Sequence, residues 1–298
     1  MNFPPTASFY RYRPSAWLRV AGCDAAAFLQ GQFTNDVRRV ADGAAVYGLW
    51  LDQKGKVLAD SFLLRGRDAE EFWIGSYFSP ASAIRRRLED YIVADDVTVE
   101  DMTPLWTGVS LIGEGSGGWL AARARAGMTF KGRRSGVENW DWILPLGSAE
   151  EAARELAGSR EMGEFEASFL RIHSGIPAVP ADIGPRDLPN EGGLEADAIS
   201  ATKGCYLGQE VMARLKSKGR IRRRLHRVSG IGPPPAVPGA LWQGGAKVGE
   251  LRSATADRDA GGFAGLAMLS LANVRLEEPL ALGENQSPSI RAAPLISI

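Results

Sequence analysis

Cys205 is the residue whose neighbours in the sequence most clearly favour chemistry. It lies between Gly204 and Tyr206, two positions after Lys203. A nearby cation favours the thiolate, which is the form of cysteine that attacks electrophiles and binds metal ions. We therefore predict that Cys205 is reactive, against the alternative that it is a small buried side chain, as most free cysteines are. Cys23 has no such neighbours, and we expect it to be structural.

The residues around this cysteine are suited to holding a ligand close to the backbone. Gly204 and Gly208 bracket Cys205, and glycine permits both positive φ angles and a close approach of a ligand. Gln209 and Glu210 follow directly, and their side chains can hydrogen-bond a ligand or brace the loop. A plain turn remains the alternative interpretation of the same residues.

The densest charge feature of the chain comes next. Between Val211 and Val228 the sequence has no acidic residue. The basic residues of this stretch are Arg214, Lys216, Lys218, Arg220, Arg222, Arg223, Arg224 and Arg227. We interpret 211–215 and 221–228 as two strands, which makes 214–227 a basic hairpin. It can bind the glutamate tail of a bound ligand, a phosphate or transfer RNA, or it is a solvated hairpin whose charge protects an edge strand.

Regular elements on both sides must position these residues. Residues 47–64 predict a β-hairpin with a turn at 52–55, and 163–173 predict a helix. Residues 176–201 are rich in proline, glycine and acids, which predicts a long loop of the kind that is often functional. Short strands with glycine-rich turns after residue 239 predict a small antiparallel barrel. The fold class is therefore α+β with a β-rich C-terminal module.

Composition limits the classes of function. The chain has 298 residues, with 35 basic and 35 acidic side chains, so net charge favours no partner. Two cysteines and two histidines are too few for a disulfide framework, for a zinc site or for an iron–sulfur cluster, which needs about four thiolates. We expect no metal site within one chain. No secretory signal and no run of roughly 20 apolar residues is present, so we expect a cytoplasmic protein without membrane contact.

The motif around Cys205 also carries a family resemblance. The segment Lys203-Gly-Cys-Tyr-Leu-Gly-Gln-Glu210, followed by Val-Met-Ala-Arg214, resembles the signature of YgfZ-type proteins, which are relatives of the glycine-cleavage T-protein, an aminomethyltransferase. Other matching segments are Phe28-Leu-Gln-Gly-Gln-Phe-Thr-Asn-Asp-Val37, Lys54-Gly-Lys-Val57, Gly175-Ile-Pro177, Leu188-Pro-Asn-Glu191 and Gly193-Leu194. The resemblance covers the chain from about Ala16 onward and is weakest at 113–136.

The resemblance implies both a fold and a role. Residues 1–225 are expected to form two interleaved α+β units around a central tetrahydrofolate pocket, and residues 226–298 a C-terminal β-barrel domain. The implied role is the assembly or maintenance of iron–sulfur proteins, including enzymes that thiolate transfer RNA.

The family's functional positions map onto particular residues of this chain. Asp60, Asp182 and Glu191 are candidates to meet the aminopyrimidine N–H groups of folate, because a carboxylate can accept two parallel hydrogen bonds. The other expected folate-binding residues belong to the motif: Lys203, Gly204, Tyr206, Gly208, Gln209, Glu210 and Arg214.

Two departures from the T-protein pattern bear on catalysis. T-proteins carry paired aspartates after the hairpin glycines, whereas this chain has Gly55-Lys-Val-Leu-Ala59-Asp60, so that Ala59 replaces the first of the pair. Asp182 stands where the T-protein has a folate-facing glutamate. A pocket for the pterin is compatible with both changes, but aminomethyl transfer by that machinery is not favoured.

Three functions remain open from the sequence. The leading hypothesis is a tetrahydrofolate-binding protein that supports iron–sulfur cluster assembly, with folate beside Cys205 and partner proteins or a small thiol supplying the missing cluster ligands. The second is a folate-dependent aminomethyltransferase or demethylase that uses Asp60, so whether the protein is an enzyme stays undecided. The third is a transfer-RNA-binding module built on the basic hairpin 214–227.

Overall fold

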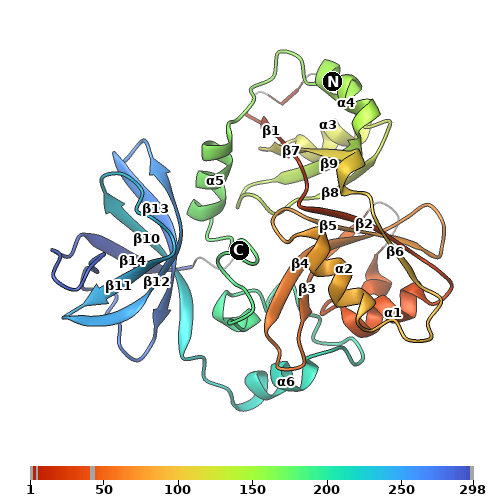
Figure 1. Ribbon diagram of the computed structural model, residues 1–298. Helices are drawn as coiled ribbons and strands as arrows, with labels where there is room; N and C mark the ends of the chain where they lie inside the picture. The colour runs from red at the N-terminus through yellow and green to blue at the C-terminus, as the bar shows by residue number, and fades with distance from the viewer. Residues whose placement is uncertain (1–2, 5, 41–43, 296–298) are drawn as a thin grey trace.

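The computed structural model describes residues 3–4, 6–40 and 44–295, and three antiparallel sheets organise these residues (Figure 1). The sheets have the strand orders β3-β4-β5-β2-β6, β1-β7-β9-β8 and β11-β12-β13-β10-β14. The strands of the first two sheets are β1 Ser8–Tyr12, β2 Ala16–Ala21, β3 Ala45–Leu51, β4 Val57–Arg65, β5 Glu71–Ser76, β6 Thr98–Asp101, β7 Trp106–Ile112, β8 Met128–Lys131 and β9 Asn139–Pro145. Those of the third are β10 Arg223–Ile231, β11 Gly239–Gln243, β12 Ala246–Asp257, β13 Gly262–Ser270 and β14 Ile290–Pro294.

Helices cover the sheets and connect them. They are α1 Ala25–Gln32, α2 Ala81–Glu89, α3 Ser116–Arg123, α4 Ala149–Glu155, α5 Glu164–His173 and α6 Gln209–Lys218. Short 3-10 helices cover Val37–Arg39, Thr103–Leu105, Leu146–Ser148 and Pro189–Glu191. Within the described residues, none of the helices has the length and apolar character required to span a lipid bilayer.

The first two sheets are interleaved along the chain, as the family resemblance implies. β1 pairs with β7 of the second sheet, and the chain then builds β2 to β6 of the first sheet before it returns. Apolar side chains of α1 and α2 pack on the first sheet, and those of α3 and α4 pack on the second. A further cluster, which includes Trp17, Phe62 and Phe130, joins the two sheets. This packing unites the two N-terminal sheets in a single α+β body.

The third sheet forms the C-terminal module. Its interior is filled by side chains such as Leu241, Phe263 and Ile290. Among the described residues the five strands do not close into a ring, and the edge strands β11 and β14 are linked there through isolated bridges at Leu280 and Ala281. The expected barrel is therefore an antiparallel sheet with bridged edges.

The predicted basic hairpin at 214–227 is wrong, because its first half is the helix α6. Val211, Met212 and Leu215 have helical spacing, and all three pack into the cluster that also contains Leu49 and Tyr206. Only the second predicted strand exists, as β10. Residues 211–215 contain one β-branched residue, Val211, so their preference for a strand is weak. A helix also buries Val211, Met212 and Leu215 together on one face. In Figure 1, α6 lies at the tip of the hairpin formed by β3 and β4.

Other predicted elements are confirmed. The hairpin at 47–64 is β3 and β4, and Gly55 in its turn has a φ of 72°. The helix at 163–173 is α5. Residues 176–201 form a long connection, but one that is well packed: Val179, Ile183 and Leu194 are all fully buried. The segment therefore positions side chains as firmly as a regular element does.

Candidate functional site

Cys205 lies on the loop before α6, and its side chain is exposed. Its near neighbours are buried: Lys203 is 6% exposed and Tyr206 is 8% exposed. The Tyr206 ring packs in the same apolar cluster as Met212 of α6, and the backbone N–H of Leu207 donates to the carbonyl oxygen of Gly31 at 3.2 Å. The loop is thus fixed on both sides while the thiol faces solvent.

Lys203 anchors this loop to the end of α1. Its Nζ donates to the carbonyl oxygens of Gln30 at 2.7 Å, Phe33 at 2.5 Å and Asn35 at 2.9 Å. A cation is favourable at a helix C-terminus, where the last carbonyl groups have no helical partners. Burial lowers the pKa of Lys203 to about 8. The three carbonyl groups engage the ammonium, so the structure gives Lys203 a positioning role toward the loop of Cys205.

The remaining motif residues differ in how strongly the structure constrains them. Gly208 has a φ of 86°, and a Cβ there would lie 2.8 Å from the carbonyl oxygen of Asp52, so the position requires glycine. Gly204 has open space around it. Gln209 and Glu210 begin α6, and Arg214 is exposed on the same helix.

Asp60 lies on β4 in a buried cluster of hydroxyl groups. Its Oδ1 accepts hydrogen bonds from Ser76 at 2.8 Å and from Ser79 at 2.7 Å, and its Oδ2 accepts from the Tyr47 hydroxyl at 3.0 Å. Burial raises the pKa of Asp60, although the three hydroxyl donors oppose that shift. The arrangement therefore holds a buried carboxyl group whose two oxygens are both hydrogen-bonded.

Two arginines beside this cluster were not predicted. The Arg133 guanidinium lies 4.3 Å from the centre of the Tyr47 ring and pairs with Asp197 at 2.7 Å. The Arg134 guanidinium lies 3.8 Å from the centre of the Tyr77 ring. Both arginines lie in 113–136, where the sequence has little periodicity. The pair of adjacent arginines near the end of this stretch was the one sequence feature that could have indicated them.

Asp182 is fully buried in a separate network. It accepts from Arg171 at 2.8 Å, from the backbone N–H of Ala178 at 2.7 Å, and from Ser253 of β12 at 2.5 Å. Ser79, which also binds Asp60, donates to the carbonyl oxygen of Val179 at 3.0 Å. Asp60 is thus linked through Ser79 to Val179, and Asp182 binds the adjacent residue Ala178. The two acids are connected to the same short segment of the chain.

Glu191 belongs to a third group, which fastens the long connection to the C-terminal sheet. Both its carboxylate oxygens accept from Arg223 of β10, at 3.0 and 2.9 Å. Arg223 also pairs with Asp187 at 3.1 Å, and Asp187 in turn pairs with Arg252 of β12 at 3.2 Å. Glu191 thus has a structural partner of its own and lies away from Cys205 in the hydrogen-bond network.

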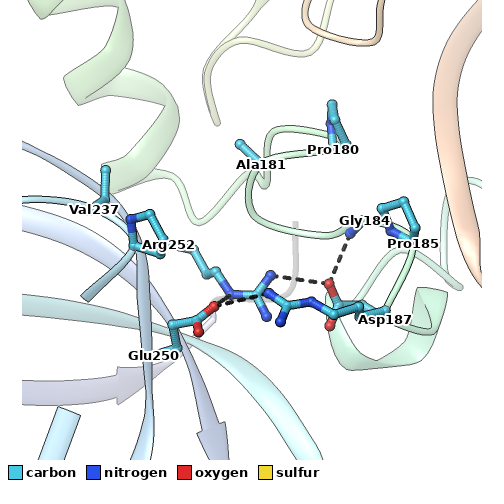
Figure 2. Close-up of a pocket in the computed structure, with 10 residues that line it drawn as sticks. Pro180, Ala181, Gly184, Pro185, Asp187, Val237, Glu250 and Arg252 are labelled. Carbon is cyan, nitrogen blue, oxygen red and sulfur yellow. Dashed lines mark hydrogen bonds and ion pairs between the residues drawn. The ribbon is translucent and has the colours of Figure 1, made fainter. Parts of the chain in front are cut away.

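A cavity of about 340 Å³ lies between this connection and the C-terminal sheet. Figure 2 shows the residues that line it. The Arg252 side chain points toward Asp187 on one wall and toward Glu250 on the other, with its Nε 2.6 Å from the carboxylate of Glu250. A larger cavity, of about 980 Å³, lies between α5 and the end of β12. Neither of these two cavities is lined by Cys205 or Asp60, so the predicted residues do not gather around either one.

The described residues contain no group of three or more histidine, cysteine, aspartate or glutamate side chains that could hold a metal ion. Cys205 and Cys23 are both free thiols.

Comparisons with known proteins place this architecture in the class of T-protein-like folds. Residues 14–130 match the model of the GCVT N-terminal domain, and residues 222–292 match that of the CAF17 C-terminal beta-barrel domain. The solved structure of aminomethyltransferase T of the glycine cleavage system from Bartonella henselae superposes with a TM-score of 0.78. It is 19% identical, and the match covers 98% of this chain and 86% of that one.

Similar proteins of known sequence indicate which members of this fold class the chain resembles. The mitochondrial iron–sulfur cluster assembly factor IBA57 of Homo sapiens is 29% identical over 299 residues, which is 93% of this chain and 80% of the relative. The tRNA-modifying protein YgfZ of Aliivibrio fischeri is 26% identical over 239 residues, which is 76% of this chain and 73% of the relative. These matches, a GCVT N-terminal domain, a CAF17 C-terminal beta-barrel domain and relatives that include IBA57 and YgfZ, support the resemblance to the YgfZ-type proteins of the glycine-cleavage T-protein superfamily.

Proposed function

We propose that this protein binds tetrahydrofolate or a derivative and supports the assembly or maintenance of iron–sulfur clusters, with Cys205 as its chemical centre. The observation that carries the proposal is an exposed thiol on a loop whose flanking residues are buried and anchored. The names of the human and A. fischeri relatives supply the cellular role. A free exposed thiol persists in a reducing compartment such as the cytoplasm.

In this role the iron–sulfur cluster would be cargo, and Cys205 would be one of its ligands. A cluster takes about four thiolate ligands, and this chain has two cysteines. Cys205 therefore supplies at most one ligand from its loop, and an iron–sulfur protein, an assembly factor or a small thiol supplies the others. The exposure of the thiol allows such a partner to approach.

The region around Asp60 has side chains that fit a pterin. Asp60 is 7% exposed, whereas Asp182 is fully buried, so Asp60 is the acid that we propose accepts from the aminopyrimidine N–H groups. Phe78, two residues after Ser76, is 37% exposed, with Arg171 lying 5.6 Å from the centre of its ring. Phe78 is linked to Asp60 through Ser76, whose hydroxyl accepts from the Phe78 N–H at 3.4 Å and donates to Asp60 at 2.8 Å. We propose that this exposed ring and the buried carboxyl together meet a flat, hydrogen-bonding ligand.

The test is calorimetric titration of reduced folates into the wild-type protein, Cys205→Ala and the matched control Cys23→Ala, with the thiols kept reduced. Micromolar binding corresponds to about −8 kcal/mol and is readily measured. Binding to all three supports a pocket in which Cys205 acts after binding. Binding lost in Cys205→Ala alone makes the cysteine loop part of the pocket. A lack of binding to the wild type overturns the folate assignment.

A second candidate is folate-dependent transfer of a one-carbon group. It is favoured by the buried Asp60 with its raised pKa, since perturbed carboxyl groups often act as acids or bases. Ala59 points to the opposite face of β4 and packs in the core cluster with Leu63 and Ile74, so the first acid of the family pair has no counterpart here. Turnover of a methylated amine with tetrahydrofolate would establish this activity, and loss of that turnover in Asp60→Asn would assign it.

A further inference from the structure

The second half of α6, the residues that follow it and the first residues of β10 carry a concentration of exposed cations, and we call residues 214–224 the basic connector. Its exposed cations are Arg214, Lys216, Arg220, Arg222 and Arg224. Within the residues that the structure describes, the side chains of these five take part in no ion pair. Arg223, in the same segment, is paired with Glu191 and Asp187. The connector is thus a local positive charge in a chain whose net charge is zero.

Neighbouring elements extend this charge. The turn between β3 and β4 packs against α6, since a Cβ on Gly55 would lie 3.0 Å from Val211, and the adjacent Lys54 is exposed. The carbonyl oxygen of Arg186 accepts from Lys56 at 3.0 Å and from Arg223 at 3.1 Å, which places Arg186 beside the connector. The Arg186 side chain is 76% exposed. Lys54, Arg186 and the connector therefore come from three separate regions of the sequence that contact one another, and the Arg186 side chain also pairs with Glu250 at 3.6 Å.

We propose that the basic connector is a docking surface for the phosphate backbone of a folded, base-paired RNA. Guanidinium groups bind phosphate oxygens through paired hydrogen bonds, and clustered cations release the counterions of a polyanion. The apolar residues of α6 (Val211, Met212 and Leu215) are directed into the core. Residues 209–224 contain no aromatic side chain, so this segment lacks the platforms that single-stranded nucleic acids stack on.

The same composition disfavours other anionic partners. Protein interfaces depend on buried aromatic and apolar anchors, and membrane-surface helices insert an apolar face. On α6 the apolar face is already occupied by the β3–β4 turn and the core. Cys205 lies four positions before α6 begins, so an RNA bound along the connector would lie close to the exposed thiol.

The test measures fluorescence anisotropy of a labelled transfer RNA transcript and of a short RNA duplex, across about 50–300 mM salt. The variant Arg220→Gln/Arg222→Gln/Arg224→Gln removes three unpaired cations of the connector. The matched control Arg67→Gln/Arg258→Gln/Arg291→Gln removes the same charge from exposed positions elsewhere. A single-stranded RNA of equal length, polyglutamate and anionic phosphatidylserine vesicles serve as competing probes.

We expect the connector variant to lose at least about tenfold in affinity for both folded RNAs, and the slope of log K against log salt to fall by up to about three. The control variant is expected to bind as the wild type does. The proposal is overturned if the two variants lose affinity equally, or if polyglutamate, vesicles or the single strand bind as tightly as the duplex. Unchanged thermal midpoints and unchanged folate titrations in the connector variant separate this result from misfolding and from failure of the proposed function.

Discussion

At the scale of single residues, the two cysteines show how surroundings distinguish chemically identical groups. Both thiols are exposed, but Cys23 lies among acids: a hydrogen bond with Asp96 raises its pKa, and the charges of Asp24 and Glu70 raise it further. Cys205 has one acid in its motif, Glu210 five positions further on, and stands before a basic segment. The two thiols are therefore not equivalent nucleophiles, although both are exposed to solvent.

We expect iodoacetamide at pH 7.5 to alkylate Cys205 faster than Cys23, by roughly threefold or more, because the raised pKa leaves Cys23 with less thiolate. Peptide mass spectrometry after timed quenching gives both rates in one sample. Cys205→Ser and Cys23→Ser confirm which peptide carries each label. Equal rates would mean that the surroundings of Cys205 do not favour its reaction.

The raised pKa of Asp60 should make the free energy of unfolding depend on pH. Its pKa is raised by burial in the folded protein, so above the unfolded value of 3.8 the folded state binds more protons than the unfolded state. The free energy of unfolding therefore falls as pH rises from that value through the folded pKa. Asp60→Asn keeps an acceptor for Ser76 and Ser79 but cannot ionise.

We expect Asp60→Asn to gain stability relative to the wild type as pH rises from about 4 to 7, with the difference smallest at the acidic end. Urea denaturation of both proteins at several pH values measures it. A difference that is constant across this range, or one that changes in the opposite direction, would show that burial does not control the ionisation of Asp60.

At the scale of elements, the junction between the motif loop and α6 depends on a single backbone conformation. Gly208 precedes the helix with a φ of 86°, and its missing side chain makes room for the carbonyl oxygen of Asp52 in the β3–β4 turn. A left-handed residue is costly for any side chain, and here the nearest atom is backbone. The turn and the helix can approach only because this position is glycine.

We expect Gly208→Ala to lower the free energy of unfolding by about 1–3 kcal/mol. The matched control is Gly204→Ala, which introduces a Cβ into open space at a residue outside the positive-φ set and should change stability by about 0.5 kcal/mol or less. Chemical denaturation measures both. Similar losses in the two variants would contradict the proposed strain at Gly208.

At the scale of the whole molecule, buried acids attach the long connection to the C-terminal sheet. Asp182 binds Ser253 of β12, and Asp187 binds both Arg252 of β12 and Arg223 of β10. Glu191 adds a two-oxygen contact with Arg223. Removal of one partner from such a network leaves a charge without compensation, which costs more than the intact pair contributes.

Arg223→Met should therefore destabilise the protein by about 2 kcal/mol, a value reduced from that of fully buried pairs because Arg223 is partly exposed. Its neighbour Arg222 is exposed and unpaired among the described residues, so Arg222→Met should change stability by about 0.5 kcal/mol or less. Urea denaturation compares the two variants. If both lose the same amount, the contacts of Arg223 do not hold the C-terminal sheet in place.

Local patterns allowed much of the fold to be predicted. The β3–β4 hairpin has a turn marked by Asp52 and Gly55 between apolar runs, and α5 has helical spacing with clear ends, so both were found without tertiary information. The first half of the basic segment was wrongly predicted as a strand, although Arg, Lys, Met and Ala are all good helix formers. Whether Val211, Met212 and Leu215 form a helical face was decided by the apolar surface of the β3–β4 turn, which is distant in sequence.

The sequence predicted which types of residue matter at the site better than it predicted how those residues are arranged. The sequence by itself determined that Cys205 is the distinctive thiol, that the chain has too few ligands for a cluster of its own, and that positive charge concentrates after the motif. Only the tertiary structure decided that Lys203 binds the end of α1, that Glu191 pairs with Arg223, and that Asp60 is surrounded by hydroxyl groups. The physical reason is that the pairing of a charge depends on which distant donors folding brings within about 3 Å, and a sequence records the charge but not its partner.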